Sequence, residues 1–508
     1  MKLLDLPLEL LLMVLCFCDV STVMLASQTN KTFHELASSR IMWISLVEDL
    51  RHRGFVDRLS AADVKAMPTS DLVAVVRRLV VGPASWSPAK ATQSRSASHV
   101  VLRPAMSPGH PFSHQDVAVL PRGEHVLLNN FRGLECWRVA DGVLVWRFES
   151  DRVMAFAADV QDGGESANLV ICINGSPSNH QGVRIVNLNF STGVAQPLLE
   201  TDFVGGACYL VDPVTPRIFG EFAAVHLQGH SFVVFDWRSQ AYCKVSEIPG
   251  PVRASWGNNI TSNLHNSESH RIALDFIPGH FIATSYERIE VYSMAALAGR
   301  WVPAEGPVHL DKTETVALGY HMSPVVADSV HPKARHYPTV VVAVQPSPLV
   351  RETFRVWIYL HPTRPRYAGC CRGKLKAYDI DDEDVHLVCF RLSLAANRAP
   401  AALAGGSESK PTRALPPLAP QLQLRQLMTI RPPGEVTYAG HTLALFGDTT
   451  SRGRRWAVSR ATPTPNGSWE SVGLIELKRR PHIKPVVTTY SGAVAYVARR
   501  SLIVQYFE

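Results

Sequence analysis

Two stretches of the 508-residue chain carry side chains suited to metal chemistry. The run Asp379-Ile380-Asp381-Asp382-Glu383-Asp384 is the densest group of acidic residues. A calcium loop places oxygen ligands at alternating positions around a central glycine and ends on a glutamate, and this run lacks that pattern. The vicinal pair Cys370-Cys371, taken with His361 or His386, matches no zinc-site spacing. We therefore predict a solvated acidic loop and no metal site.

Signatures of common enzymes are absent from the chain. It contains no GxxxxGK[ST] phosphate loop, no GxGxxG dinucleotide turn, no HExxH zinc helix and no GxSxG nucleophile turn. The 20 histidines are scattered along the sequence. We therefore predict no catalytic residue and no cofactor, although missing motifs do not exclude catalysis.

Composition and charge are those of an ordinary globular protein, with 46% hydrophobic and 19% charged residues. The net charge of +7 (51 basic minus 44 acidic residues) does not demand a nucleic-acid partner, and none is expected. Nine cysteines without a CxxC pair favour reduced thiols and an intracellular location, cytoplasmic and/or nuclear. The longest apolar run, residues 10–18, is too short to cross a bilayer and follows acidic residues, so we expect neither a membrane segment nor a signal peptide.

Basic clusters mark the C-terminal part of the chain: Arg452-Gly453-Arg454-Arg455, Lys478-Arg479-Arg480 and Arg499-Arg500. Such clusters can meet an acidic partner, phosphate groups or a nuclear import receptor. They are also typical of solvated turns, and we expect the latter here.

The first 46 residues favour short helices with more apolar side chains than so small a segment can bury. Pro7 suits the first turn of a helix, where its missing N–H would be unpaired anyway. The apolar stripe of that helix is predicted to comprise Leu10, Leu11, Val14, Leu15 and Cys18. The next three helices have candidate capping residues in Asp19 or Ser21, Thr29 or Asn30, and Ser38 or Ser39. Such a segment needs a partner protein or a core supplied from elsewhere.

This segment resembles the F-box. The resemblance is carried by Leu6-Pro7-x-Glu9-Leu10, Asp19-Val20 and Met42-Trp43-x-x-Leu46, and it covers about 45 residues. It implies docking onto the adaptor subunit of an SCF-type ubiquitin ligase, in the manner of helices recognised by a groove. The implied adaptor-binding residues are Leu6, Pro7, Leu10 and Val14 or Leu15, with Val20, Leu25 and Trp43 supporting packing or contact. The chain departs from the family where a Cys-Lys/Arg pair is replaced by Thr29-Asn30-Lys31. A generic helical bundle packed on the rest of the chain is the alternative.

Two further helices are predicted, at 61–67 behind a Ser60/Asp63 capping pattern and at 70–81. The Gly/Pro/Ser-rich stretch 82–98 follows as a connector. Residues 55–81 also resemble the inter-module linker of fungal-type F-box proteins, which implies that they hold two domains apart.

From residue 99 onward, β-type runs separated by turns dominate the sequence. A loose repeat, about 50 residues long at first, recurs at 134–139, 183–188, 232–237, 289–292, 354–359 and 502–507. Repeats of this length are typical of propeller blades, and the first copy resembles a WD-type repeat. We predict about seven blades, with one insertion-bearing blade between the last two copies. A strand at 100–102 would close the ring beside the C-terminal strand, and residues 397–421 are predicted to be a flexible insertion.

The sequence therefore predicts a multidomain protein: a small all-α F-box-like helical module (1–53), a helical linker and connector (54–98) and a large all-β propeller-like domain (99–508). Its first predicted function is substrate recognition for an SCF-type ubiquitin ligase. The expected partners are the adaptor, a cullin bound through the adaptor, and unknown target proteins. One alternative is a protein-interaction scaffold without a ligase link. Another is a propeller enzyme with a site in the central channel.

Overall fold

The structure is a computed structural model. It describes residues 6–86, 98–104, 117–130, 133–150, 153–174, 181–204, 216–227, 231–247, 273–285, 288–309, 312–330, 339–361, 386–394, 423–430, 437–446, 455–462, 468–475, 486–490, 492–498 and 501–507. The predicted acidic loop at 379–384, Cys370-Cys371, the insertion at 397–421 and most of the C-terminal basic clusters lie outside these residues.

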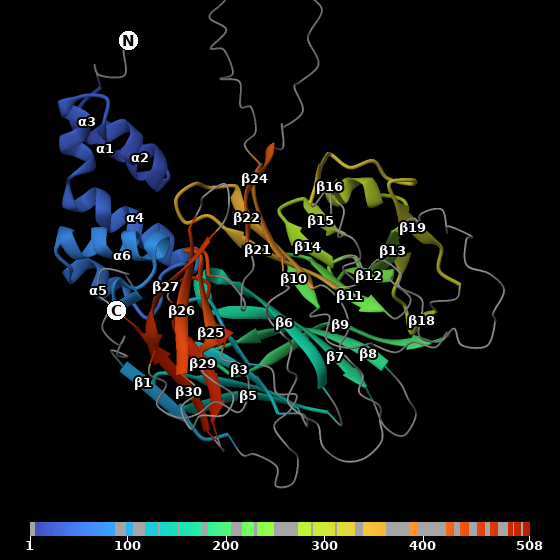
Figure 1. The fold of residues 1–508 in the computed structure, drawn as a ribbon. Helices are drawn as coiled ribbons and strands as arrows, with labels where there is room; N and C mark the ends of the chain where they lie inside the picture. The colour runs from blue at the N-terminus through green and yellow to red at the C-terminus, as the bar shows by residue number, and fades with distance from the viewer. Residues whose placement is uncertain are drawn as a thin grey trace, which may run out of the picture.

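Six helices occupy the described N-terminal part (Figure 1): α1 (Leu8–Cys16), α2 (Val20–Ser27), α3 (Lys31–Ala37), α4 (Arg40–His52), α5 (Ala61–Ala66) and α6 (Thr69–Val81). Side-chain caps set where the helices begin. Asp19 Oδ1 accepts the Thr22 N–H at 2.7 Å, and Asn30 Oδ1 accepts the Phe33 N–H at 2.9 Å. Ser39 caps α4, and Ser60 with Asp63 forms a complete capping box before α5. The structure thus selects Asp19, Asn30 and Ser39 from the predicted pairs.

One hydrophobic cluster contains side chains from all six helices, and it reaches the β domain at its edge. Val23, Val47, Val64 and Leu72 are fully buried in it, and Leu349 and Tyr490 pack against its edge. The prediction that the linker holds two domains apart is therefore wrong. The apolar faces of α5 and α6 complete a core that α1–α4 are too small to form alone, so the linker helices pack on both sides.

The described strands form seven sheets, here called blades 1–7. Blade 1 is β2 (Val117–Val119), β3 (His125–Asn129), β4 (Gly133–Arg138) and β5 (Val143–Glu149); blade 2 is β6 (Val153–Gln161), β7 (Ser166–Asn174), β8 (Gln181–Asn189) and β9 (Ala195–Val204). Blade 3 is β10 (Arg217–Phe219), β11 (Phe222–Leu227), β12 (Ser231–Asp236) and β13 (Ala241–Glu247); blade 4 is β14 (Ala273–Ile277), β15 (His280–Thr284), β16 (Arg288–Ser293) and β20 (Val326–Ser329). Blade 5 is β21 (Thr339–Pro346), β22 (Thr353–His361), β23 (His386–Ser393) and β24 (Gln423–Ile430); blade 6 is β25 (His441–Phe446), β26 (Arg455–Thr462) and β27 (Ser468–Ile475). Blade 7 is β28 (Val486–Val487), β29 (Val494–Ala498), β30 (Ser501–Tyr506) and β1 (Ser98–Leu102).

Three short strands between β16 and β20 extend neighbouring sheets. They are β17 (Val302–Pro303) and β19 (Thr315–Leu318), which both pair with β13, and β18 (Val308–His309), which pairs with β9. One segment of blade 4 therefore covers the outer edges of blades 2 and 3, which protects edge strands from pairing with other chains.

The blades follow one another around a ring. Separate hydrophobic clusters join blade 7 to 1, 1 to 2, 2 to 3, 3 to 4 and 4 to 5. Tyr438, just before β25, links blade 6 to both neighbours: its hydroxyl donates to Ser347 Oγ at 3.0 Å, and its N–H donates to Thr489 O at 2.8 Å. The pairing of β1 with β30, with Val100 opposite Val504, closes the ring between the two ends of the domain (Figure 1). In the described part of the chain, these features define a β-propeller of seven blades and confirm the predicted closing strand.

Each predicted repeat copy is one strand of a different blade: β4, β8, β12, β16, β22 and β30. The blade without a copy is blade 6, which lies between the last two copies as expected. Residues 397–421 fall between β23 and β24 of blade 5, so the expectation that the insertion belongs to the extra blade is wrong. Cys172 and Cys389 are buried and act as small core residues.

Buried His125 on β3 makes the stability of blade 1 sensitive to acid. Burial lowers the pKa of His125 to about 4, and Arg138 and Arg122 act in the same direction. An unfolded chain binds this proton near pH 6.5, so the folded state loses stability as the pH falls from 6.5 towards 4. We expect a loss of up to about 3 kcal/mol, measured by urea unfolding at pH 7 and pH 4.5. His125→Phe should reduce this pH dependence, whereas replacement of exposed His99 by glutamine should not.

Candidate adaptor-binding surface

Helix α1 is apolar on nearly every side, so its burial is necessarily incomplete. Leu11 and Leu15 are buried, and Leu15 belongs to the helical core. Leu10, Met13, Val14 and Phe17 point away from that core and remain exposed, with Phe17 75% exposed. These four are spaced i, i+3, i+4 and i+7, which places them on one face of the helix.

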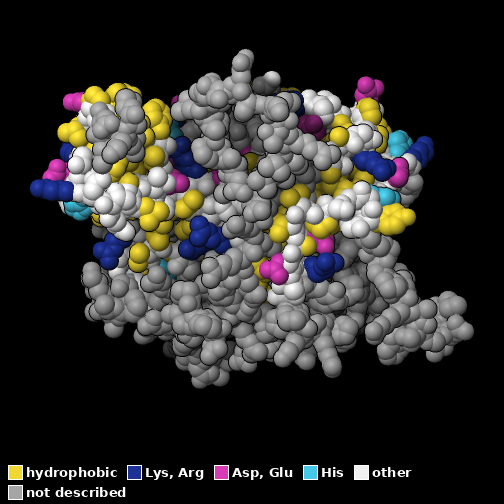
Figure 2. Space-filling view, turned by 90° about the horizontal axis from the view of Figure 1, so that it is seen from above, with side chains coloured by type: hydrophobic (Ala, Val, Ile, Leu, Met, Phe, Trp, Pro, Cys, Tyr) yellow, Lys and Arg dark blue, Asp and Glu magenta, His cyan; other side chains and the backbone are white. Residues whose placement is uncertain are grey.

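Exposed apolar side chains also occur on the neighbouring helices. We call the set the apolar helical surface; it comprises Leu8, Leu10, Met13, Val14, Phe17, Met24, Leu25 and Ile41. Figure 2 shows hydrophobic side chains gathered over this end of the molecule. Soluble proteins rarely leave such a concentration of apolar area facing water unless another protein covers it.

The residues predicted to bind the adaptor divide into two groups. Pro7, Leu10, Val14 and Leu25 are exposed, and Leu6 is partly exposed. Leu15, Val20 and Trp43 are buried inside the helical core. Between the alternatives Val14 and Leu15, the structure therefore leaves Val14 available for contact. Leu15, Val20 and Trp43 stabilise the module from within.

Five members of the apolar helical surface were missed by sequence reasoning: Leu8, Met13, Phe17, Met24 and Ile41. The spacing of Leu10, Met13, Val14 and Phe17 could have revealed part of this face. The signal was hidden because Leu11, Leu12 and Leu15 fill the other side of the same helix, so the helix has little amphipathic contrast.

The propeller meets the helical part through the turns that join the first and second strands of several blades. Arg58 N–H donates to Arg122 O in the β2–β3 turn at 3.0 Å. The ring of Phe55 meets that of Tyr490, in the β28–β29 turn, edge-on at 4.7 Å. A Cβ added at Gly163, in the β6–β7 turn, would lie 3.3 Å from His52 Nδ1 on α4. The helices thus rest on one particular face of the propeller.

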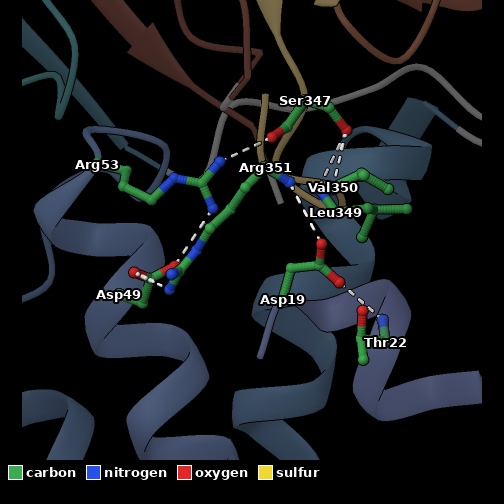
Figure 3. Close-up of polar contacts among 8 residues, drawn as sticks. All are labelled: Asp19, Thr22, Asp49, Arg53, Ser347, Leu349, Val350 and Arg351. Carbon is green, nitrogen blue, oxygen red and sulfur yellow. Dashed lines mark hydrogen bonds and ion pairs between the residues drawn. The ribbon is translucent and has the colours of Figure 1, made fainter. Parts of the chain in front are cut away.

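The β21–β22 turn, residues 347–352, makes the closest polar contact with the F-box-like helices (Figure 3). Arg351 extends to Asp49 on α4, with 2.9 Å between the guanidinium and the carboxylate. Arg53, directly after the end of α4, contacts the same carboxylate at 3.2 Å and donates to Ser347 O at 2.9 Å. Asp49 therefore bridges two arginines, one from each part of the chain.

The four buried cysteines of the described β domain are poor nucleophiles. Burial raises the pKa of the Cys136, Cys172 and Cys389 thiols to about 12 and that of Cys243 to about 11. These residues therefore stay protonated at neutral pH, and the thiolate that would react or bind a metal is not formed. Within the described ranges, no three His, Cys, Asp or Glu side chains gather as they would around a metal ion.

Residues 3–45 match the family model of the F-box domain. The chain therefore carries an F-box, formed by α1–α3 and the first part of α4, followed by a β-propeller. The search of curated proteins found no significant match to the chain. No helix in the described part is both long enough and apolar enough to cross a membrane.

Several solved structures are similar to the chain at low sequence identity. The β-propeller domain of Cps50 (Swd1) from Myceliophteria thermophila is 8% identical, with a TM-score of 0.42 and coverage of 81% of this chain and 100% of that one. A chain of a mitotic checkpoint complex is 9% identical, with a TM-score of 0.38 and coverages of 81% and 95%. The WD40 domain of SCAP from fission yeast is 13% identical, with a TM-score of 0.36 and coverages of 78% and 82%. The propeller assignment itself follows from the strand pairing of this chain.

Proposed function

We propose that the protein is a substrate-recognition subunit of an SCF-type ubiquitin ligase. The observation that carries this proposal is an F-box whose apolar helical surface stays exposed although its interior is fully packed. The adaptor subunit would cover that surface and link the chain to a cullin. The chain itself would act without catalytic residues, cofactor, nucleic acid or membrane, in the cytoplasm and/or nucleus. Its role would be to raise the local concentration of target lysines near a charged ubiquitin carrier.

Leu6, Pro7, Leu10, Val14 and Leu25 are the proposed contact residues, joined by Met13 and Phe17 from the same surface. Apolar and aromatic anchors on a helix that enters a groove supply most of the binding energy in such interfaces. We further propose three functional units: residues 1–53 bind the adaptor, residues 54–98 connect, and residues 99–508 recruit targets.

The face of the propeller opposite the helices is the proposed target-binding face. The β2–β3, β6–β7, β21–β22 and β28–β29 turns lie on the face that meets the helical part. Because neighbouring strands within each blade are antiparallel, the second strands end and the third strands begin on the other face. Loops on a rigid scaffold commonly carry recognition, and that face is free of the helices.

Co-expression with the SCF adaptor, followed by size-exclusion chromatography, tests the proposal. We expect the wild-type chain to co-elute with the adaptor and a Leu6→Ala/Pro7→Ala/Leu10→Ala variant to elute alone. Thermal unfolding of the variant would show that its fold is retained. A wild-type chain that stays monodisperse and unbound would contradict the ligase proposal and favour a scaffold. Bound metal or substrate turnover in the central channel would instead favour an enzyme.

A further inference from the structure

Helix α2 is capped at its N-terminus by two different parts of the chain. The first N–H groups of a helix have no partner within the helix. Asp19 Oδ1 takes the N–H of Thr22, and the carbonyl of Leu349, in blade 5, takes the N–H of Ser21 at 3.0 Å. The side chain of Leu349 also packs against the cluster that contains Val20 and Val23. The propeller therefore completes a helix that belongs to the F-box.

The turn that supplies this carbonyl is held firmly. Ser347 Oγ accepts the N–H groups of Leu349 and Val350, each at 3.2 Å, which fixes the local backbone (Figure 3). The hydroxyl of Tyr438, in blade 6, donates to the same oxygen, and the hydroxyl of Tyr490, in blade 7, donates to Pro346 O at 2.7 Å. Three blades thus determine where Leu349 lies.

Charged groups tie the same turn to the helices. Besides the Arg351–Asp49 ion pair, the N–H of Arg351 points at Asp19 Oδ2 at 3.4 Å. Asp19 consequently faces both α2, which it caps, and the turn (Figure 3). Helix α2 in turn presents exposed Met24 and Leu25 on the apolar helical surface.

We propose that the β21–β22 turn is a positioning element of the adaptor-binding site, with Leu349 and Arg351 as its positioning residues. The turn fixes the start of α2, and α2 fixes Met24 and Leu25 where the adaptor meets them. The affinity of the F-box for the adaptor thus depends on the fifth blade of the propeller. This inference rests on the proposed function. Because coupling between two sites is reciprocal, adaptor binding must also stabilise the turn.

The test compares a Leu349→Ala/Arg351→Ala variant with the wild-type full-length chain. Hydrogen exchange of the Ser21 and Thr22 amides should accelerate at least about tenfold in the variant, even without adaptor. The dissociation constant for the SCF adaptor should rise roughly tenfold, because an ion pair and a partly buried leucine contact are lost from the support. The Arg351→Lys variant should recover part of the affinity, since lysine can reach Asp49 but offers one point charge.

The matched control is Arg300→Ala. Arg300 pairs with Glu314 at 3.4 Å, and its side chain is 42% exposed against 46% for Arg351, but it lies in blade 4's outer segment, away from the helices. Its removal should leave both amide exchange and adaptor affinity unchanged. A reciprocal measurement needs no substitution: adding the adaptor to the wild-type chain should slow exchange in residues 347–352.

The outcomes are distinct. If the wild-type chain binds the adaptor and the Leu349→Ala/Arg351→Ala variant binds it with the same affinity, the coupling is overturned and the proposed function stays intact. This conclusion holds even if amide exchange at Ser21 is faster in the variant. Unchanged protection of residues 347–352 upon adaptor binding would overturn it as well. A wild-type chain that does not bind the adaptor would overturn both the proposed function and this inference.

Discussion

Replacing Phe17 by aspartate is expected to weaken adaptor binding at least about a hundredfold while leaving the chain folded. Phe17 is the most exposed aromatic side chain of the F-box, at 75%, and lies at the end of the face formed by Leu10, Met13 and Val14. An aromatic anchor contributes a large apolar area to an interface. An aspartate in its place would have to be buried without a partner charge. Isothermal titration of the purified chain with the adaptor measures the effect.

Tyr320 supplies the matched control for Phe17. It is an aromatic residue of equal exposure, 76%, on the segment that follows β19. Tyr320→Asp should bind the adaptor with wild-type affinity, because β19, which ends two residues before it, lies on the opposite side of Figure 1 from α1–α4. If Phe17→Asp and Tyr320→Asp behave alike, the apolar helical surface is not the adaptor site.

The helices could be predicted from the sequence because their signals are local. Asp19, Asn30, Ser39 and Ser60 are side-chain caps, and each acts on a backbone N–H within three residues of itself. The blades were found by a repeated buried strand, which is again a local pattern of apolar and aromatic residues. The closing strand at 100–102 was predictable because a propeller must bury its last edge.

What could not be predicted depends on contacts between distant parts of the chain. Whether Leu15 or Val14 faces solvent is decided by the direction of α1 relative to α4, and neither side of so apolar a helix is marked. The carbonyl of Leu349 that caps α2 lies more than 300 residues from Ser21 in the sequence, and a backbone carbonyl leaves no trace in residue type. In the sequence, Arg351 looks like an ordinary surface charge, because its partner Asp49 is distant along the chain and meets it only in the folded structure.

Trp86 attaches the end of the linker to the propeller. The short 3-10 turn Ala84–Trp86 places the indole, 2% exposed, in a cluster with residues of β29, β30 and Phe507. Its ring lies 5.5 Å from that of Phe507 and 5.4 Å from that of His441, so it contacts blades 6 and 7 together. The backbone at Gly492 also packs closely against the indole, since a Cβ added there would lie 3.1 Å from it.

Trp86→Ala is therefore expected to destabilise the chain by about 3–5 kcal/mol, the usual cost of truncating a fully buried tryptophan. Urea unfolding measures the loss, and hydrogen exchange should show residues 82–86 exchanging faster than in the wild type. Trp86→Phe should cost clearly less, because the buried indole N–H finds no acceptor among the described residues and its removal relieves an unpaired donor. Trp301→Ala is the control: Trp301 is only partly buried, so its loss should cost less than that of Trp86. Equal losses for Trp86→Ala and Trp301→Ala would mean that the linker is not anchored by this indole.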